Sequence, residues 1–577
     1  MRKFTADFET TTEADDCRVW AFALCEIGWT ENFIYGNSMD EFMEWCGDRC
    51  HNFELYFHNL KFDGCYIISW LLSNGFTWIE DKKDRDDKTF TTLITDMGQF
   101  YSITIYFEAH NAKHVNKITI KDSLKILNFS VERIAQDFNL PIQKLKIDYK
   151  AKRPIGHRLT EDEIAYIRND VEIMARALEI MFEEGLTKMT IASDALADFK
   201  ERIINFKHFF PELPLEIDQD IRRSYKGGFT YLNPIYQGME IGAGYVLDKN
   251  SMYPSKMVKE LLPVGWPVFF EGKYEKDKIH PLYIQRLTCT FKLKKGKIPS
   301  IQLKNCPSFK PNEYIESSND ELVTLTLCSP DLELFFSNYD VEDIVWQGGW
   351  KFRGVRGIFK TYVEYWTEKK IEAKKDHNGA KYIISKLMLN SLYGRFGLNP
   401  MSRTKKPYLK EGVLKFELND LELRKPIYVA MASFITAYAR KDIIESSQKI
   451  REYSKKYYGY DAYVYSDTDS IHCLLKLQDL NKMKRDLDID EYKLGAWKIE
   501  SEFRRAKFLR QKCYIEEDEN NLNVTVAGLP KRLGKYINFD NFEIGFTTEG
   551  MKIEEHKLSY KQVKGGVLLV DTDFTIK

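Results

Sequence analysis

Two aspartates, Asp467 and Asp469, lie one residue apart within residues 463–472. Aromatic and β-branched residues flank them on both sides, so we expect two short strands that meet at a tight turn. In an extended chain, residues two apart point to the same side, so both carboxylates can reach one spot. Mg2+ prefers oxygen ligands, and one or two carboxylates together with substrate phosphates suffice to hold it. The pair therefore indicates a candidate phosphoryl-transfer site.

The Asp-x-Asp pattern alone is weak evidence, because a solvated turn is its ordinary interpretation. The pattern recurs at Asp218/Asp220, Asp486/Asp488 and Asp571/Asp573. What gives Asp467 and Asp469 weight is a partner acid elsewhere. Asp248 ends the apolar run of residues 245–247, and Pro254 favours a break before a following helix.

The N-terminal part contains a second set of acids. Asp7 and Glu9 alternate in the strand-like residues 4–10 and so share a face. Asp63 follows a strand-like run that begins at Leu55, and we expect it in the turn after that strand. Acids grouped in this way can hold two metal ions about 3.5–4 Å apart and align a water molecule against a phosphate.

A helix completes this second set. Residues 160–163 form a capping-box pattern, which predicts a helix over residues 164 to about 182. Tyr166 and Asp170 are four residues apart and so lie on one face of it. Any one acid is more often ordinary surface. The ordered set of Asp-x-Glu, Asn-x-x-x-Asp and Tyr-x-x-x-Asp is much more specific and indicates a nuclease site.

Three further motifs carry groups suited to nucleic acids. Tyr225 precedes Gly227 and Gly228, and paired glycines permit close approach of the backbone to a ligand. Lys512 and Tyr514 are expected on one strand face in a basic, aromatic segment that suits primer phosphates. The alternative interpretation is a plain turn for the glycine motif and a solvated basic strand for the Lys512 segment.

The third motif is helical. Lys386, Asn390 and Tyr393 form one stripe of a helix, which can grip a triphosphate and stack on a base. An amphipathic surface helix is the alternative interpretation of the stripe alone.

Bulk properties limit the class of protein. A chain of 577 residues is too long for one core, so several domains are expected. Lys and Arg number 85 against 86 Asp and Glu, so any nucleic-acid-binding surface must be local. The ten cysteines suit a reducing compartment, and no apolar run is long enough to span a membrane. The N-terminus lacks the apolar core of a signal peptide, so we expect the cytoplasm of a host cell as the location.

Together these motifs, in this order, resemble the family B DNA polymerases, and among them the protein-primed type of small tailed Bacillus phages. The resemblance implies a multidomain α/β and α+β protein, with an RNase-H-like 3′–5′ exonuclease domain and a right-hand polymerase. It implies that Asp7, Glu9, Asp63 and Asp170 hold metal ions, assisted by Tyr166 and Lys144. Residues implied to steady the single-stranded 3′ end are Tyr56, His58, Asn59, Phe62, Ser123 and Leu124.

For the polymerase half, the resemblance implies that Asp248 and Asp469 are the main metal ligands, with Asp467 beside them. It places Tyr253 under the sugar of the incoming nucleotide, where its ring excludes a 2′-hydroxyl. Phosphate contacts are assigned to Lys386 and to Lys374. Tyr382 stands where the family has a lysine one turn before Lys386, so Lys370 and Lys381 stay open as alternatives to Lys374. Tyr225, Gly227 and Gly228 match a template-binding hinge, and Lys512 and Tyr514 match the family's Lys-x-Tyr motif.

Two long segments that interrupt the motifs resemble the insertions of protein-primed polymerases. There the first docks a terminal protein whose hydroxyl replaces the primer end, and the second supports processivity and strand displacement. The expected division is an exonuclease domain (1–190), palm (191–260 and 427–529), terminal-protein-docking insertion (261–357), fingers (358–396), strand-displacement insertion (397–426) and thumb (530–577).

We therefore expect a DNA-dependent DNA polymerase with proofreading that acts as a monomer and does not bind membranes. Its implied cofactor is Mg2+, with Mn2+ plausible, at two ions per active site. Its implied partners are template and primer DNA, deoxynucleoside triphosphates and a phage terminal protein. The alternatives are a nucleic-acid-primed family B enzyme, a nuclease with an inactive polymerase half, and a structural nucleic-acid-binding protein.

Overall fold

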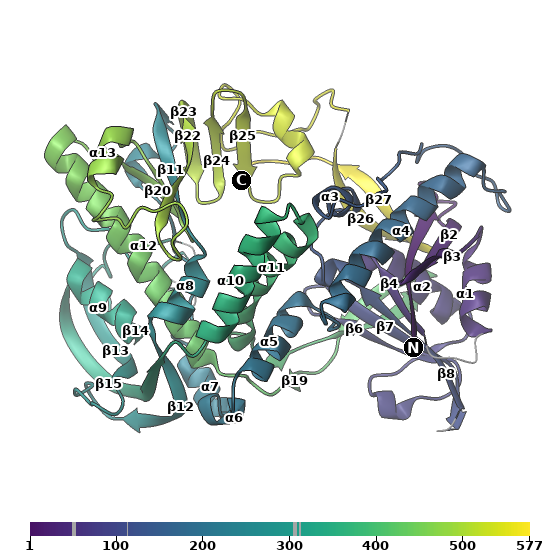
Figure 1. The fold of residues 1–577 in the computed structure, drawn as a ribbon, viewed down its shortest axis with the longest axis horizontal. Helices are drawn as coiled ribbons and strands as arrows, with labels where there is room; N and C mark the ends of the chain where they lie inside the picture. Colours follow the sequence, from purple (N-terminus) through teal and green to yellow (C-terminus); the bar gives the residue numbers. More distant parts are fainter. Residues whose placement is uncertain (49–52, 112–113, 304–307, 311–312, 555) are drawn as a thin grey trace.

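The computed structural model describes residues 1–48, 53–111, 114–303, 308–310, 313–554 and 556–577. The N-terminal sheet has the strand order β3-β2-β1-β4-β8-β7-β6-β5 (Figure 1). Its strands are β1 (Arg2–Thr10), β2 (Val19–Glu26), β3 (Trp29–Gly36), β4 (Phe53–Phe57), β5 (Thr77–Trp78), β6 (Thr89–Ile94), β7 (Phe100–Asn111) and β8 (His114–Asp122). The accompanying helices are α1 (Met39–Gly47), α2 (Leu60–Ser73), α3 (Val131–Asp137) and α4 (Glu161–Glu183).

The N-terminal sheet places its acids at the junction of buried elements. Strand β1 is antiparallel to β2 and parallel to β4, so it lies inside the sheet. The expected capping box at Thr160 is present and starts α4. The expectation of Asp63 in a turn is wrong, because α2 begins at Leu60 and places Asp63 in its first turn. That early start follows from Asn59, whose φ of 80° turns the chain sharply after β4.

The central sheet, with strand order β22-β11-β21-β20-β9, carries the second set of acids. Its strands are β9 (Thr230–Leu232), β11 (Gly244–Lys249), β20 (Tyr463–Asp467), β21 (Ser470–Cys473) and β22 (Trp497–Phe503). The long helix α12 (Val429–Tyr458) packs against it, as does α8 (Met252–Lys259), while α13 (Leu477–Lys482) follows β21. Pro254 lies inside α8 and does not precede it, since the third helical position needs no backbone N–H donor.

A second sheet with strand order β10-β23-β24-β25 adjoins the central sheet. It contains β10 (Glu240–Ile241), β23 (Arg505–Arg510), β24 (Cys513–Glu517) and β25 (Leu522–Val526). The expectation that Lys512 and Tyr514 share a strand face is wrong. Lys512 occupies the turn between β23 and β24 with a φ of 55°, whereas Tyr514 lies within β24.

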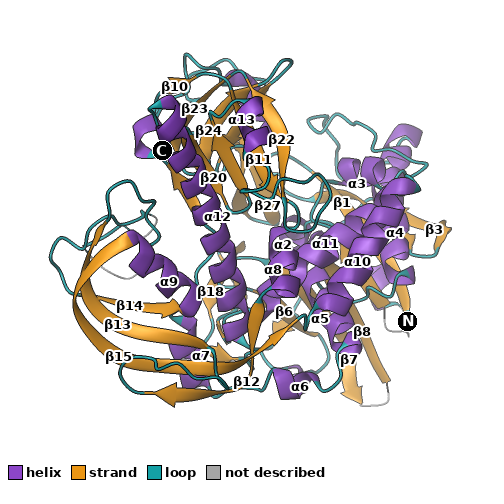
Figure 2. Cartoon of the chain, turned by 60° about the vertical axis from the view of Figure 1, so that its left-hand side comes forward, coloured by secondary structure: helices purple, strands orange, loops and turns teal. Residues whose placement is uncertain are grey.

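Residues 261–357 build a sheet with a core of its own. The strand order is β12-β15-β13-β14, and Figure 2 shows α9 on one face of this sheet. The elements are β12 (Leu261–Phe270), β13 (Leu282–Leu293), β14 (Val323–Cys328), α9 (Ser329–Asn338) and β15 (Tyr339–Arg356). Leu325, Leu332, Phe335 and Tyr339 are buried together, as the apolar pieces of this segment predict.

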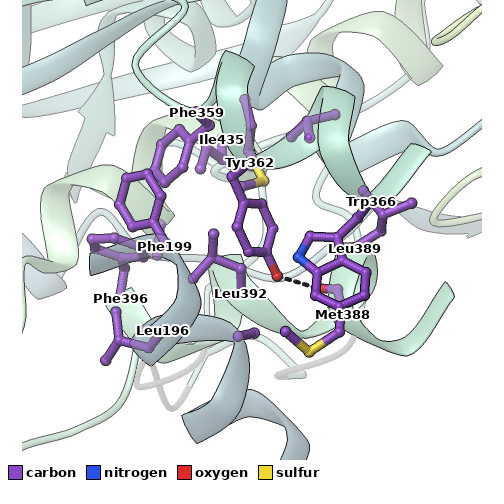
Figure 3. Packing of buried hydrophobic residues seen from close by; sticks show 14 of the residues in the cluster. Leu196, Phe199, Phe359, Tyr362, Trp366, Met388, Leu389, Leu392, Phe396 and Ile435 are labelled. Atoms are coloured by element: carbon purple, nitrogen blue, oxygen red, sulfur yellow. Dashed lines mark hydrogen bonds between the residues drawn. The ribbon is translucent and has the colours of Figure 1, made fainter. Parts of the chain in front are cut away.

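The helices α10 (Lys360–Lys375) and α11 (Gly379–Phe396) form an antiparallel pair in the centre of the molecule (Figure 1). They pack on α5 (Ile191–Arg202) and α12 through Phe199, Phe359, Tyr362 and Phe396 (Figure 3). Tyr362 also donates a hydrogen bond of 2.7 Å to the Met388 carbonyl and so ties the two helices together.

The α10–α11 pair is also attached to the N-terminal part by charge. Glu184, which follows α4, pairs with Lys369 of α10 at 2.7 Å and with Lys381 of α11 at 3.5 Å. One carboxylate thus holds both helices. The short α6 (Phe206–Phe209) and α7 (Leu215–Arg222) complete this central region.

Two hairpins pack on the N-terminal domain. The first is β17 (Lys405–Lys410) with β18 (Val413–Leu418), framed by β16 (Met401–Ser402) and β19 (Glu422–Leu423). Leu414 is buried in the N-terminal core, and Phe416 lies edge-on to Phe100. The second is the C-terminal hairpin, β26 (Lys557–Val563) with β27 (Gly566–Thr572), drawn in yellow in Figure 1. A bridge between Val413 and Lys564 joins the tips of the two hairpins.

In the described part of the chain, no helix combines the length and the apolar character that crossing a bilayer would require.

A buried ion pair fastens α9 to α12. The Arg440 guanidinium donates to the two Asp331 carboxylate oxygens at 3.1 and 2.6 Å, and both side chains are almost fully buried. The same guanidinium donates to the carbonyls of Lys226 and Gly227 at 2.8 and 2.7 Å. Arg440 therefore connects residues 261–357, the long helix and the glycine-containing loop.

We predict that Asp331→Ala lowers the free energy of unfolding by about 3 kcal/mol, because it leaves a buried guanidinium without its counter-ion. Urea unfolding followed by tryptophan fluorescence measures the effect. The matched control is Glu333→Ala, which removes the exposed pair with Lys441 from the same two helices and should cost less than about 1 kcal/mol. Equal costs for the two variants would contradict the importance of the buried pair.

Candidate active sites

The first site lies where α4 crosses the inner strands of the N-terminal sheet. Asp7 and Glu9 project from β1 toward Asp170 of α4, and carboxylate oxygens of the three residues lie within 4.8 Å of one another. Asp63 approaches from the first turn of α2, close enough for the charges of Asp7 and Glu9 to raise its pKa. The structure thus gathers all four acids that the sequence singled out.

The electrostatics of this site favour a bound cation. Burial, followed by the charge of Asp170, raises the pKa of Asp7 to about 7. Burial and the charge of Asp7 likewise raise the pKa of Glu9 and of Asp63. Among the described residues, Asp63 Oδ1 and Asp170 Oδ1 are buried and accept no hydrogen bond. Oxygen ligands of this kind fit a hard divalent ion, which would stabilise the charged carboxylates together.

Lys144 and two tyrosines border the acids. Lys144 Nζ contacts the Asp170 carboxylate and lies 3.4 Å from Tyr166 Oη. Burial alone would lower the pKa of Lys144, but Asp170 outweighs it and raises the pKa, so the lysine stays charged. Tyr166 Oη also hydrogen-bonds Tyr149 Oη at 2.7 Å. Sequence reasoning missed Tyr149, because it lies in an irregular segment without helical or strand periodicity. Only its position five residues after Lys144 in the sequence could have pointed to it.

The residues expected to steady a single strand differ in exposure. Asn59 and Phe62 are half-exposed at the start of α2. His58 hydrogen-bonds Ser123 Oγ at 3.1 Å and the Phe129 carbonyl at 2.7 Å, and burial lowers its pKa. Leu124 is half-buried beside Ser123.

The expectation that Tyr56 contacts DNA is not supported. Its side chain is only 2 % exposed, and its hydroxyl donates to Glu54 at 2.9 Å. The reason is its place on β4, which has neighbours on both sides in the sheet and packs Tyr56 against the core. Tyr56 therefore has a structural role in the core.

The second site lies at one end of the central sheet. Asp248 is the last residue but one of β11 and lies opposite Ser470, and the Lys249 amide donates to the Asp469 carbonyl at 2.8 Å. Burial, then the charges of Glu500 and Asp469, raise the pKa of Asp248 to about 6. Burial and the charge of Asp467 also raise the pKa of Asp469. This second set of acids therefore also favours a bound cation.

Asp467 has a different environment from Asp469. Its carboxylate accepts hydrogen bonds from Thr230 at 3.1 Å and Tyr465 at 3.2 Å, and pairs with Lys512 at 3.2 Å. The two acids are not on one extended stretch, as the sequence suggested, because Thr468 between them has a φ of 61°. This left-handed conformation is strained for a β-branched residue, and it turns the two carboxylates to different neighbours.

Lys498 and Glu500 of β22 are part of this second site and were missed. Lys498 is paired with Asp248 in register and its Nζ lies 3.4 Å from the carboxylate. The alternation of charges in residues 498–502 was the available signal, since alternate residues of a strand share a face.

A nucleotide-sized group of residues faces these acids from α8 and α11. The rings of Tyr253 and Tyr393 are stacked with centroids 4.1 Å apart. A Cβ at Gly228 would lie 2.8 Å from Thr468 and 3.1 Å from the Tyr253 hydroxyl, so only glycine permits this approach of the loop. Lys386 and Asn390 are exposed on the same stripe of α11 as Tyr393.

The three candidate phosphate lysines of the α10–α11 pair lie in different places. Lys381 pairs with Glu184 and Lys374 is exposed. Lys370 Nζ lies 3.5 Å from Ser251 Oγ, and its pKa is lowered by burial and then by Lys386 and Lys498. Lys370 thus lies close to Lys386 of α11 and to Lys498 of the second site, so the geometry favours it over the exposed Lys374.

The remaining DNA-binding candidates border the same region. The Tyr225 hydroxyl lies against Gly397, where a Cβ would come within 2.6 Å of it. Gly227 and Lys512 line a hollow of about 750 Å³ beside the second site. Tyr514 stacks on Phe508 with centroids 5.0 Å apart, and so supports the turn that carries Lys512.

Comparison with known proteins shows the class of protein that this fold and these acids define. The family model described as "DNA polymerase type B, organellar and viral" matches residues 49–158 and 152–489, more than half of the chain. The chain belongs to this family of DNA polymerases. The resemblance found in the sequence is thereby confirmed.

The particular relatives are phage enzymes. The chain is 46 % identical to the DNA polymerase of Bacillus phage B103 over 100 % of both chains. It is 42 % identical to that of Bacillus phage phi29, over 100 % of this chain and 99 % of the relative. A solved structure of phi29 DNA polymerase complexed with primer-template DNA and incoming nucleotide substrates matches with a TM-score of 0.91, covering 100 % of both chains. This match confirms the expected multidomain polymerase fold.

We predict that Asp7→Asn stabilises the metal-free protein at pH 8. The pKa of Asp7 is higher in the folded protein, about 7, than its ordinary value of 3.8. The neutral carboxyl therefore adds stability that is fully present below pH 3.8 and is lost as the pH rises through 7. In EDTA at pH 8 the melting temperature should rise by roughly 2 °C or more, and by less at pH 5.

Mn2+ should raise the melting temperature of the wild type more than that of Asp7→Asn, by mass action on the folded state. Asp15→Asn is the matched control, since it removes an exposed charge nearby and should change neither value. A lower melting temperature of Asp7→Asn in EDTA at pH 8 would contradict the repulsion described above.

Proposed function

We propose that this DNA polymerase copies a linear phage genome in the cytoplasm of its host, with its own 3′–5′ proofreading. The observation that carries the proposal is the presence of two separate acidic sites on two separate sheets. Each contains fully or partly buried carboxylates of raised pKa, and each is bordered by residues suited to DNA or nucleotides. Full-length similarity to the phage polymerases supports the same conclusion.

At the central sheet, Asp248 and Asp469 would hold the divalent ions, Mg2+ or Mn2+, with Asp467 beside them. Two such ions would activate the primer 3′-hydroxyl and stabilise the charge of the leaving pyrophosphate. Lys386 and Lys370 or Lys374 neutralise the triphosphate, and the stacked Tyr253 and Tyr393 provide the floor for the sugar and base. Tyr225, Gly227, Gly228, Lys512 and Tyr514 guide the template and primer.

At the N-terminal sheet, Asp7, Glu9, Asp63 and Asp170 would hold the ions of a nuclease. Burial raises the pKa of Tyr166, so its hydroxyl stays protonated and can orient a water molecule. Lys144 holds Asp170 in place and offers positive charge to the attacked phosphate. Asn59, Phe62 and Leu124 position the unpaired 3′ end, while the fully buried Ser123 holds His58 in place through a hydrogen bond of 3.1 Å.

Two alternative functions do not account for the residues of the central-sheet site. A nuclease with an inactive polymerase half, or a purely structural DNA-binding protein, would not need Asp248 and Asp469 brought together with raised pKa values, nor Tyr253 close to Asp469. A nucleic-acid-primed enzyme is the remaining alternative, and only the priming reaction separates it from the protein-primed type.

We predict that the two activities separate by mutation. Asp469→Ala should lower primer extension about a thousandfold, since one metal ligand is worth several kcal/mol, at about 1.4 kcal/mol per factor of ten. It should leave degradation of single strands intact. Asp7→Ala combined with Glu9→Ala should do the reverse. Extension of a labelled primer and digestion of a labelled single strand, both with Mg2+, measure the two activities. Loss of both in either folded variant would rule out independent sites.

The insertions support a proposal about priming. Residues 261–357 have their own core and are fastened to the glycine-containing loop through Arg440, which suits a docking domain for a terminal protein. Residues 397–426 form a lysine-containing hairpin whose tip meets the C-terminal hairpin, which suits a clasp around DNA. The division into exonuclease, palm, fingers and thumb given above, and action as a monomer, belong to the same proposal.

We predict that the protein joins the first deoxynucleotide to a hydroxyl of a phage terminal protein. Incubation of polymerase, Mg2+, labelled deoxynucleoside triphosphate and candidate terminal protein should give a labelled protein band, which Asp469→Ala should abolish. Replacing residues 405–418 by a short glycine linker should preserve gap filling but lose displacement of a downstream strand. Primer extension without any labelled protein would instead indicate a nucleic-acid-primed enzyme.

A further inference from the structure

The C-terminal hairpin reaches back to the start of α2, more than 480 residues away in the chain (Figure 1). Tyr66 of α2 donates a hydrogen bond of 2.6 Å to the Val567 carbonyl of β27. Gln562 of β26 donates to Cys65 Sγ at 3.2 Å. A Cβ at Gly566 would lie 2.3 Å from the Tyr66 ring, so the hairpin sits directly on the helix. Its position is therefore fixed by packing and hydrogen bonds.

Tyr560 of β26 is the residue of this hairpin that contacts Asn59 and Phe62, two of the residues proposed to hold the unpaired 3′ end. Its hydroxyl accepts a hydrogen bond of 3.0 Å from Asn59 Nδ2. Its ring centroid lies 6.3 Å from that of Phe62, and Lys61 Nζ lies 5.0 Å from the ring. The Tyr560 side chain is 40 % exposed, so part of its ring remains open to a ligand.

Both the backbone amide and the side-chain amide of Asn59 are hydrogen-bonded. Its backbone amide donates to Asp122 Oδ1 at 3.0 Å, while Tyr560 holds its side-chain amide. An amide nitrogen has two hydrogens, so Nδ2 keeps one for another acceptor after bonding Tyr560. Tyr560 thus fixes the direction in which Asn59 presents its amide, and its exposed ring continues the aromatic surface begun by Phe62. Aromatic rings beside basic and amide groups are the surface on which unpaired bases stack.

We propose that Tyr560 is a positioning residue for the unpaired 3′ end, so that the C-terminal hairpin forms part of the surface that binds the single strand at the exonuclease site. The inference rests on the exonuclease function proposed above. The opposite role, a latch that covers Asn59 and Phe62, uses the same contacts but predicts the opposite effect of mutation.

Steady-state degradation of a labelled single strand tests the proposal. Tyr560→Phe removes the hydroxyl that orients Asn59 and should raise KM about threefold with kcat unchanged. Tyr560→Ala also removes the ring and should raise KM about tenfold. Primer extension on a long duplex should be unchanged for both, and Tyr492→Ala, at an 83 % exposed tyrosine elsewhere, should change nothing.

An unchanged or lower KM in Tyr560→Phe would overturn the proposal, and a lower KM would identify a latch. Equal losses in primer extension would also overturn it, because they would indicate a general effect on the fold. Single-strand affinity measured by fluorescence anisotropy in the Asp7→Ala, Glu9→Ala background gives an independent readout. If the wild type fails to degrade single strands, the exonuclease proposal fails, while this binding measurement still decides the role of Tyr560.

Discussion

Mutual repulsion among buried carboxylates is the constraint on which the rest of the structure depends. Asp7, Glu9, Asp63 and Asp170 come from a strand and two helices, and burial raises the pKa of each of them. Such a group cannot assemble by its own attraction; the surrounding core must force it together. The sheet, the capped α4 and the sharp turn at Asn59 supply that force. The same principle holds at the central sheet, where antiparallel pairing brings Asp248 close to Asp469.

The two sites balance the negative charge of their acids in different ways. At the N-terminal sheet, one lysine, Lys144, partly balances the acids. At the central sheet, Lys498 forms an ion pair with Asp248 and Lys512 with Asp467, whereas Asp469 is influenced by Lys512 only from a distance. The left-handed Thr468 accompanies this division, because the chain turns between the two carboxylates and gives them different neighbours.

Much of this arrangement was predictable from the sequence, and the limits have physical causes. Strand alternation and the capping box correctly placed Asp7, Glu9, Tyr166 and Asp170, because these depend on local periodicity. Asp63 and Lys512 were assigned to the wrong local structure, since left-handed residues at Asn59 and Lys512 itself set the helix start and the turn. Exposure was not predictable either, as the burial of Tyr56 shows. Contacts across hundreds of residues, such as Asn59 with Tyr560, leave no periodic signal at all.

Helix α4 has a mechanical consequence. It carries Tyr166 and Asp170 in its first half, while Glu184 at its end holds Lys369 and Lys381 of the α10–α11 pair. A helix of 23 residues is a stiff rod about 35 Å long. Any rotation of the helix pair must therefore either break these two ion pairs or move the end of the rod. Partly exposed ion pairs weaken as ionic strength rises, so salt loosens the joint between the two halves of the enzyme without touching either set of acids.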